Sequence, residues 1–259
     1  MKKYLTRISH HRANRTHYVF EECHSPGGVT RATAAVGRIP SCGSSGEKSR
    51  LVLFSCALLL SATIFAAADN SLFRGIDDPK VLPLLTSGYG KSNRWNVPPQ
   101  DGRFLYDLIL ARGYKRGLEI GTSNGYSGLW LGLALRKNGG KLITIEIDSE
   151  RASEAQGNFV KAGLNDVIEL RVADALKEIP QLKGNFDFVF IDAWKPDYKK
   201  YLDLVIPQVT VGGAITAHNV LSLASGMNDF LQAIKNHPQL ETTFHKTSSE
   251  GISVSFKKP

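Results

Sequence analysis

From about residue 100 onward, short runs of apolar residues alternate along the chain with segments in which apolar residues recur every three or four positions. Short apolar runs predict β-strands, whereas apolar residues spaced three or four apart predict amphipathic helices between them. The predicted strands are 116–120, 141–148, 167–174, 186–193, 213–220, 240–246 and 252–257. The predicted helices are 101–113, 127–137, 149–162, a short one leading to residue 180, 196–209 and 225–236.

The order of these elements predicts how the strands pair. Asp101 and Ser149 stand where helix N-caps are expected, and Gly113 and Gly163 follow the last apolar positions of the same two helices. Strands separated by helices need crossover connections, which make the strands parallel. Only the last two strands are close enough to form a hairpin. The predicted fold is therefore α/β, a doubly wound and mostly parallel sheet of seven strands with an antiparallel last strand.

The segment 51–68 contains 18 uncharged residues and follows Lys48 and Arg50. Its small residues at 66–68 are typical of a signal-peptide cleavage site. A core helix would show a polar stripe, which this segment lacks, but an uncleaved membrane anchor stays open because the length is near the minimum for a span. The segment predicts an exported (periplasmic) or membrane-anchored protein. If the segment is not used, the protein is expected to be cytoplasmic.

The segments on either side of this apolar stretch have no clear periodicity. Residues 1–50 carry nine basic and three acidic side chains with Gly/Ser clusters, and they predict a disordered basic leader or a start codon downstream of Met1. Residues 69–100 are rich in proline and predict an N-terminal cap that helps to form a substrate pocket, with Tyr89 and Trp95 as its aromatic candidates. Residues 101–259 then form the main domain.

Composition narrows the classes of site that the domain can hold. The net charge of +8 comes mostly from the leader, which argues against a nucleic-acid-binding face on the domain. The three cysteines all precede residue 57, so the domain has no disulfide, thiolate metal site or cysteine nucleophile.

Polar side chains at successive strand ends predict a nucleoside-containing ligand. Gly121 and Gly125 bracket the turn after the first strand, where glycine lets the backbone approach a ligand closely. The spacing differs from both the dinucleotide-binding pattern and the P-loop. Glu146 ends the second strand, 25 residues after Gly121, where a carboxylate suits a ribose diol. Asp174 ends the third strand and suits an adenine amino group.

Several motifs in order resemble one enzyme family. They are NVPPQDGRFLYDLI, GLEIGTSNGYSGLWLGLAL, LITIEID, VADAL, FDFVFIDAWKPDYKKYLDL and AHNVL. Together, over roughly residues 95–258, they resemble the S-adenosylmethionine-dependent O-methyltransferases of the catechol and caffeoyl-CoA type. The resemblance implies a Rossmann-like methyltransferase fold and methyl transfer to a hydroxyl group of a small, catechol-like molecule.

The resemblance also implies roles for individual residues around S-adenosylmethionine. Glu119 and Gly121 would line the methionine part, Ser123 and Ser127 would contact its carboxylate, and Glu146 would hold the ribose. Ala173 and Asp174 would flank the adenine. Trp194 would pack near the adenine ring, although simple core packing explains a tryptophan equally well.

The reaction centre is expected where the fourth and fifth strands end. By resemblance, Asp192 and Asn219 are metal ligands and Lys195 is the general base. Free lysine has a pKa of about 10.4, so a nearby cation and partial desolvation would have to lower it. The family pattern has Asp before Asn at the fifth strand end, whereas this chain has His218.

The histidine leaves the metal question open. A divalent cation, Mg²⁺ or Mn²⁺, is one expectation, with His218 as a third ligand; an imidazole ligand shifts the preference toward Mn²⁺, Fe²⁺ or Zn²⁺. In the alternative, His218 is a general base in a metal-free site. Two further alternatives are a metal-independent methyltransferase with another acceptor and a non-catalytic S-adenosylmethionine-binding protein. A homodimer also stays open, and no nucleic-acid partner is expected.

Overall fold

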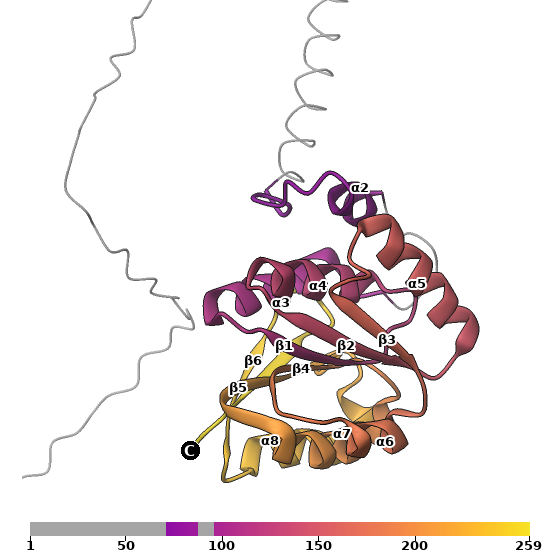
Figure 1. The fold of residues 1–259 in the computed structure, drawn as a ribbon. Helices are drawn as coiled ribbons and strands as arrows, with labels where there is room; N and C mark the ends of the chain where they lie inside the picture. Colours follow the sequence, from indigo (N-terminus) through magenta and orange to yellow (C-terminus); the bar gives the residue numbers. More distant parts are fainter. Residues whose placement is uncertain (1–70, 88–95) are drawn as a thin grey trace, which may run out of the picture. The chain divides into compact units, whose positions relative to one another are not determined.

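The computed structural model describes residues 71–87 and 96–259, which contain one seven-stranded sheet (Figure 1). The strand order is β3-β2-β1-β4-β5-β7-β6, and β7 runs antiparallel to both of its neighbours while the other pairs are parallel. The strands are β1 Arg116–Ile120, β2 Lys141–Glu146, β3 Ile168–Val172, β4 Phe186–Ile191, β5 Val209–His218, β6 Leu240–His245 and β7 Ile252–Lys257. The predicted doubly wound sheet with an antiparallel last strand is confirmed.

Helices cover both faces of this sheet (Figure 1). They are α2 Val81–Thr86, α3 Pro99–Arg112, α4 Tyr126–Lys137, α5 Ser149–Ala162, α6 Ala175–Glu178, α7 Tyr198–Val205 and α8 Asn228–Asn236. Short 3₁₀ turns flank α6, α7 and α8 at Ile179–Gln181, Lys195–Asp197, Ile206–Gln208 and Ala224–Gly226.

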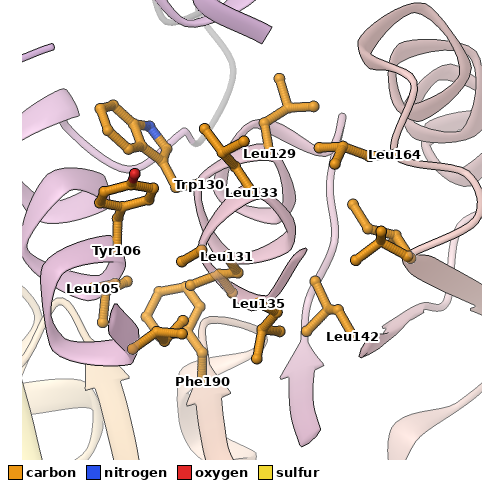
Figure 2. Packing of buried hydrophobic residues seen from close by; sticks show 14 of the residues in the cluster. Leu105, Tyr106, Leu129, Trp130, Leu131, Leu133, Leu135, Leu142, Leu164 and Phe190 are labelled. Carbon is orange, nitrogen blue, oxygen red and sulfur yellow. The ribbon is translucent and has the colours of Figure 1, made fainter. Parts of the chain in front are cut away.

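The hydrophobic core has two layers because side chains alternate between the faces of each strand. In β4, Phe188 and Phe190 point into the layer formed with α3, α4 and α5, whereas Val189 and Ile191 point into the layer formed with α6, α7 and α8. Figure 2 shows the first layer, where Phe190 lies near leucines of α3 and α4. Val81 and Leu85 of α2 join this layer as well. Helices therefore cover both faces of the sheet, and a ligand site is expected at the ends of the strands.

Two predicted helix caps are wrong. The helix α5 is capped by Asp148, whose carboxylate accepts the backbone N–H groups of Glu150 and Arg151, and not by Ser149. The helix α3 begins at Pro99, so Asp101 lies inside its first turn and does not cap it. Proline is preorganised for the first helical position, which moves the start upstream. The carboxylate of Asp101 is consequently free for a different role.

The two strands at the centre of the sheet bring the most important loops together. β1 and β4 are neighbours, with Ile120 opposite Ile191, yet their following helices cover opposite faces. Ligands of open α/β sheets bind at such a switch point. A Cβ atom on Gly121 would lie 2.3 Å from the carbonyl oxygen of Asp192, and Gly121 has φ of +99°. The glycine loop therefore touches the backbone of Asp192.

Several expectations concern segments outside the described residues. These are the leader 1–50, the apolar segment 51–68, and Tyr89 and Trp95. Within residues 71–87 and 96–259, no helix has the length and apolar character that crossing a membrane requires.

Candidate functional site

Glu119 is a fully buried carboxyl group beside the glycine loop. Its Oε2 accepts a hydrogen bond of 2.6 Å from Thr144, but its Oε1 has no hydrogen-bond partner although it is buried. Burial raises the pKa of Glu119 to about 7, against the opposing hydrogen bonds from Ser127 and Thr144. An unpaired buried carboxylate oxygen is costly unless a ligand supplies a donor or a positive charge.

Glu146 ends β2 next to the same loop and is 5% exposed. Its Oε2 accepts the backbone N–H of Ser123 at 2.7 Å, and its Oε1 accepts the N–H of Asp148 at 3.0 Å and the side chain of Arg151 at 2.9 Å. Ser123 has φ of +51°, which is unusual for a residue other than glycine. The carboxylate of Glu146 therefore holds the strained loop in place and keeps accepting capacity for a further donor.

The residues predicted to surround an adenine ring are arranged around the ends of β2, β3 and β4. The carboxylate of Asp174 accepts the N–H of Leu176 and caps α6, so one of its oxygens is committed. Trp194 is 69% exposed, which makes the core-packing interpretation wrong. Ile147 is 68% exposed directly after Glu146. Two large apolar side chains thus lie open to solvent beside the polar strand ends.

Lys195 and Asp192 form an ion pair at the end of β4. The Nζ of Lys195 lies 2.9 Å from Oδ1 of Asp192 and 2.9 Å from the phenol oxygen of Tyr198. Both charged side chains are largely buried. Tyr198 is fully buried, and burial raises its pKa well above the ordinary value, so its phenol stays neutral. The ammonium group is therefore held by an acid on one side and a neutral oxygen on the other.

His218 ends β5 between two carboxylates. Its Nε2 lies 2.8 Å from Oδ2 of Asp101, and its Nδ1 lies 3.3 Å from Oδ2 of Asp192. Burial alone would lower the pKa of His218, but the two carboxylates raise it to about 9. Burial would likewise raise the pKa of Asp192, but the charges of His218 and Lys195 hold it at about 2. The four groups thus form one buried charged network.

Asn219 follows His218 in a left-handed backbone conformation, with φ of +59°. Its side-chain amide donates a hydrogen bond of 2.7 Å to Oε2 of Glu250, and Ser222 also bonds this carboxylate. The amide is thereby tied to the turn between β6 and β7, and its acceptor oxygen is the group left for a ligand.

These donors do not fit a hard divalent cation such as Mg²⁺. Such ions prefer several carboxylate or carbonyl oxygens, whereas of the three predicted ligands Asp192 offers a carboxylate, Asn219 an amide and His218 an imidazole, and the carboxylate of Asp101 is paired with His218. Both oxygens of Asp192 and both ring nitrogens of His218 already have partners inside the cluster. Within the described part of the chain, no group of three or more His, Cys, Asp or Glu side chains is arranged to hold a metal ion.

The structure brings most of the predicted residues to one edge of the sheet and adds four that the sequence analysis did not assign to the site. These additions are Asp101, Tyr198, Glu250 and Ile147. Tyr198 follows Lys195 by three residues, a helical spacing that places the two side chains on one face and could have indicated the contact. Asp101 and Glu250 pair with residues far away in sequence, and no local pattern indicates that.

Comparisons with known proteins agree with this arrangement. Residues 82–241 match a family model described as O-methyltransferase. The catechol O-methyltransferase of Niastella koreensis is 41% identical over 130 residues, covering 49% of this chain and 58% of that protein. The catechol O-methyltransferase of Mycobacterium tuberculosis is 34% identical over 184 residues, covering 66% of this chain and 83% of that protein.

Solved structures show the same fold. The crystal structure of the O-methyltransferase from Bacillus cereus in complex with SAH has a TM-score of 0.64 and 27% identity, covering 74% of this chain and 97% of that chain. The chain spans somewhat more than half the length of most of the curated relatives that it matches. The likeness in fold agrees with the sheet order and with the antiparallel β7.

Proposed function

The chain belongs to the O-methyltransferase family, and from this premise we propose that it transfers the methyl group of S-adenosylmethionine to a hydroxyl group of a small acceptor. Relatives that are named catechol O-methyltransferase support a catechol-like acceptor. A relative solved with SAH supports the choice of methyl donor.

The residues around the glycine loop fit S-adenosylmethionine. The unpaired Oε1 of Glu119 offers a buried negative charge to the cationic methionine part, beside Ser123 and Ser127. Glu146 has accepting capacity for a ribose hydroxyl. Ile147, Ala173, Asp174 and Trp194 lie near the strand ends where an adenine would rest, and the exposed Ile147 and Trp194 offer it apolar surface. When bound, the donor supplies a methyl group on a sulfonium, which departs as a neutral thioether.

The side chains at the ends of β4 and β5 then handle the acceptor. Lys195 is the general base: its resting ammonium, paired with Asp192, first releases a proton to solvent, and the neutral Nζ then takes the proton of the acceptor hydroxyl as the new O–C bond forms. Asp192 holds Nζ in place and stabilises the ammonium that results. Tyr198 fixes the same nitrogen from the other side. Both side chains are largely buried, so the attraction between their charges is stronger than it would be in water.

One observation carries the proposal most directly: the glycine loop and the Asp192–Lys195 pair adjoin. A side chain at position 121 would collide with the backbone of Asp192, so a ligand along this loop ends next to the ion pair. This adjacency supports a proposal in which donor and base meet at the switch point between β1 and β4, as transfer to a hydroxyl that loses its proton requires.

The test is transfer of labelled methyl from S-adenosylmethionine to a panel of catechols and simple phenols, using the full chain. We expect a methyl ether from the wild type and a loss of about 100-fold or more for Lys195→Met, because a positioned base contributes that much. Binding of S-adenosylhomocysteine, followed by calorimetry, should change little in this variant because Lys195 lies on the acceptor side.

Lys199→Met is the matched control, since Lys199 lies in α7, directly after the 3₁₀ turn that holds Lys195, and pairs with the exposed Asp203. Its activity should equal that of the wild type. Binding of S-adenosylhomocysteine without methylation of any acceptor would favour a non-catalytic binding protein. Absence of any binding heat would show that the assignment of the methyl donor is wrong.

A further inference from the structure

The position where the family pattern has a metal-binding aspartate carries His218, and both of its ring nitrogens are engaged. Nε2 faces Oδ2 of Asp101 at 2.8 Å and Nδ1 faces Oδ2 of Asp192 at 3.3 Å. Nε2 lies within hydrogen-bond distance of one carboxylate, and Nδ1 makes an ion-pair contact with the other; beside two ionised carboxylates, which only accept, both nitrogens carry a proton. An imidazole that is protonated at both nitrogens has no lone pair left for a metal ion.

The two carboxylates that face His218 also have other hydrogen-bond or ion-pair partners. Asp101 is fully buried and also accepts hydrogen bonds from Thr247 and from Ser248, the latter at 2.7 Å. Asp192 accepts from Lys195 through its other oxygen. To bind a cation here, the protein would have to break an ion pair whose members are almost entirely buried. Breaking one side of such a pair leaves an uncompensated buried charge, which is strongly unfavourable.

The charges in this cluster also balance without a metal. Asp101 and Asp192 each contribute one negative charge, and the side chains of His218 and Lys195 each contribute one positive charge. We propose that the side chain of His218, held between Asp101 and Asp192, occupies the place of the divalent cation, and that the site neither binds nor needs such an ion. The claim that methyl transfer needs no divalent cation rests on the proposed function. The claim that the site binds no such cation can be tested without any methyl transfer.

In this arrangement His218 and Asp101 act as positioning residues. His218 is 3% exposed, so it acts on the acceptor through Asp192 and through its charge. A divalent cation could hold two neighbouring hydroxyl oxygens at once, whereas this cluster presents to the acceptor a single side-chain nitrogen, Nζ of Lys195. The acceptor therefore needs one hydroxyl group, and a second hydroxyl beside it gives no added binding through a metal.

The test is calorimetric titration of Mg²⁺ and, separately, Mn²⁺ into the full-length protein, loaded with S-adenosylhomocysteine and previously dialysed against a chelator. The wild type should show no saturable binding below about 1 mM. The double variant Asp101→Asn/His218→Asp restores an aspartate at the cation position and removes the facing charge. It should bind Mn²⁺ at least about tenfold more tightly than the wild type.

Saturable binding of one equivalent of Mn²⁺ or Mg²⁺ to the wild type at a dissociation constant below about 1 mM would overturn the inference. A double variant that still binds S-adenosylhomocysteine but gains no metal affinity would also overturn it. His237→Asp is the control for a histidine-to-aspartate change, since His237 lies outside the cluster and its ring accepts the backbone N–H of Gln239. The wild-type titration decides the matter even where the double variant does not fold.

A separate assay keeps this inference distinct from the proposed function. Methyl transfer by the wild type should proceed equally well with and without a chelator. If no acceptor is methylated while the wild type still binds no cation, the proposed function fails and the assignment of the cation position stands.

Discussion

The Nε2 atom of His218 lies 2.8 Å from Oδ2 of Asp101, although the two residues are 117 positions apart in the chain. This contact joins the end of β5 to the first turn of α3. Because Asp101 also bonds Thr247 and Ser248, the turn between β6 and β7 is tied to the same point. Three segments distant in sequence thus meet at one buried ion pair, and its charge state must affect stability.

We expect the free energy of unfolding to fall as the pH rises from about 6.5 to about 9. The folded state holds the pKa of His218 at about 9, above its ordinary value, so the stabilisation is complete below pH 6.5 and is lost as the pH passes 9. The full effect is about 3 kcal/mol. Urea denaturation at a series of pH values measures it. In His218→Gln this part of the pH dependence should vanish, and parallel curves for the two proteins would contradict the assignment.

Binding of S-adenosylhomocysteine should strengthen as the pH rises through about 7, the pKa to which burial raises Glu119. The ionised carboxylate attracts the ligand's amino group, so Glu119 must lose a proton before or during binding. Calorimetry in buffers of different ionisation enthalpy should detect release of this proton near pH 6. Glu119→Gln should bind more weakly and show no such dependence. A wild-type affinity that is constant from about pH 5.5 to 8 would contradict this role.

Tyr198→Phe tests whether the phenol positions Lys195, whose Nζ lies 2.9 Å from it. The fully buried ring should still fit, so stability should change by only about 1 kcal/mol. We expect kcat to fall about tenfold and the pH profile of kcat to move, with KM for the donor unchanged. Tyr201→Phe on the same helix is the control. An effect of Tyr198→Phe on KM alone would mean that the phenol contacts substrate and does not position the base.

Glu146→Gln should weaken binding of S-adenosylhomocysteine by about tenfold or more. A glutamine cannot accept at both side-chain positions, so it loses either the ribose contact or the hydrogen bond from the N–H of Ser123. The exposed Glu150, four residues further on, provides the control Glu150→Gln. Equal affinities of the two variants, measured by calorimetry, would rule out a ribose contact.

Gly121→Ala should destabilise the protein by more than about 2 kcal/mol and abolish binding of the methyl donor. Its φ of +99° disfavours any side chain, and its Cβ would lie 2.3 Å from a backbone oxygen. Gly139→Ala separates the two causes: Gly139 has φ of +73°, but a Cβ there meets nothing within 4 Å. Thermal unfolding of both variants should show a clearly smaller loss for Gly139→Ala; equal losses would mean that backbone conformation alone explains the effect.

The sequence predicts the sheet and most of the site because these depend on local patterns. Apolar runs fix the strands, and the rule that parallel strand ends share an edge gathers Glu119, Glu146 and Asp192 at one place. The partners of His218 were not predictable in this way. Asp101 looked like a helix cap, because its polarity at a helix start has a local explanation, whereas its actual contact depends on how α3 packs against the strand ends.

The sequence also did not predict which side chains near the site are exposed to solvent. A tryptophan in a strand-to-helix turn is compatible with core packing, and only the three-dimensional arrangement reveals that Trp194 is 69% exposed. The metal question depended on the same kind of information, since a histidine beside Asn219 is a plausible ligand until both of its ring nitrogens are found engaged.

The phenol of Tyr126 donates a hydrogen bond of 3.2 Å to the carbonyl oxygen of Leu85, which joins the start of α4, just after the glycine loop, to α2. This bond sets a boundary for truncation. Proteolytic trimming after Ala68 would leave α2 in place, whereas trimming beyond Leu85 would remove the anchor of Tyr126. A form that begins after Leu85 is therefore expected to be less stable than one that keeps α2.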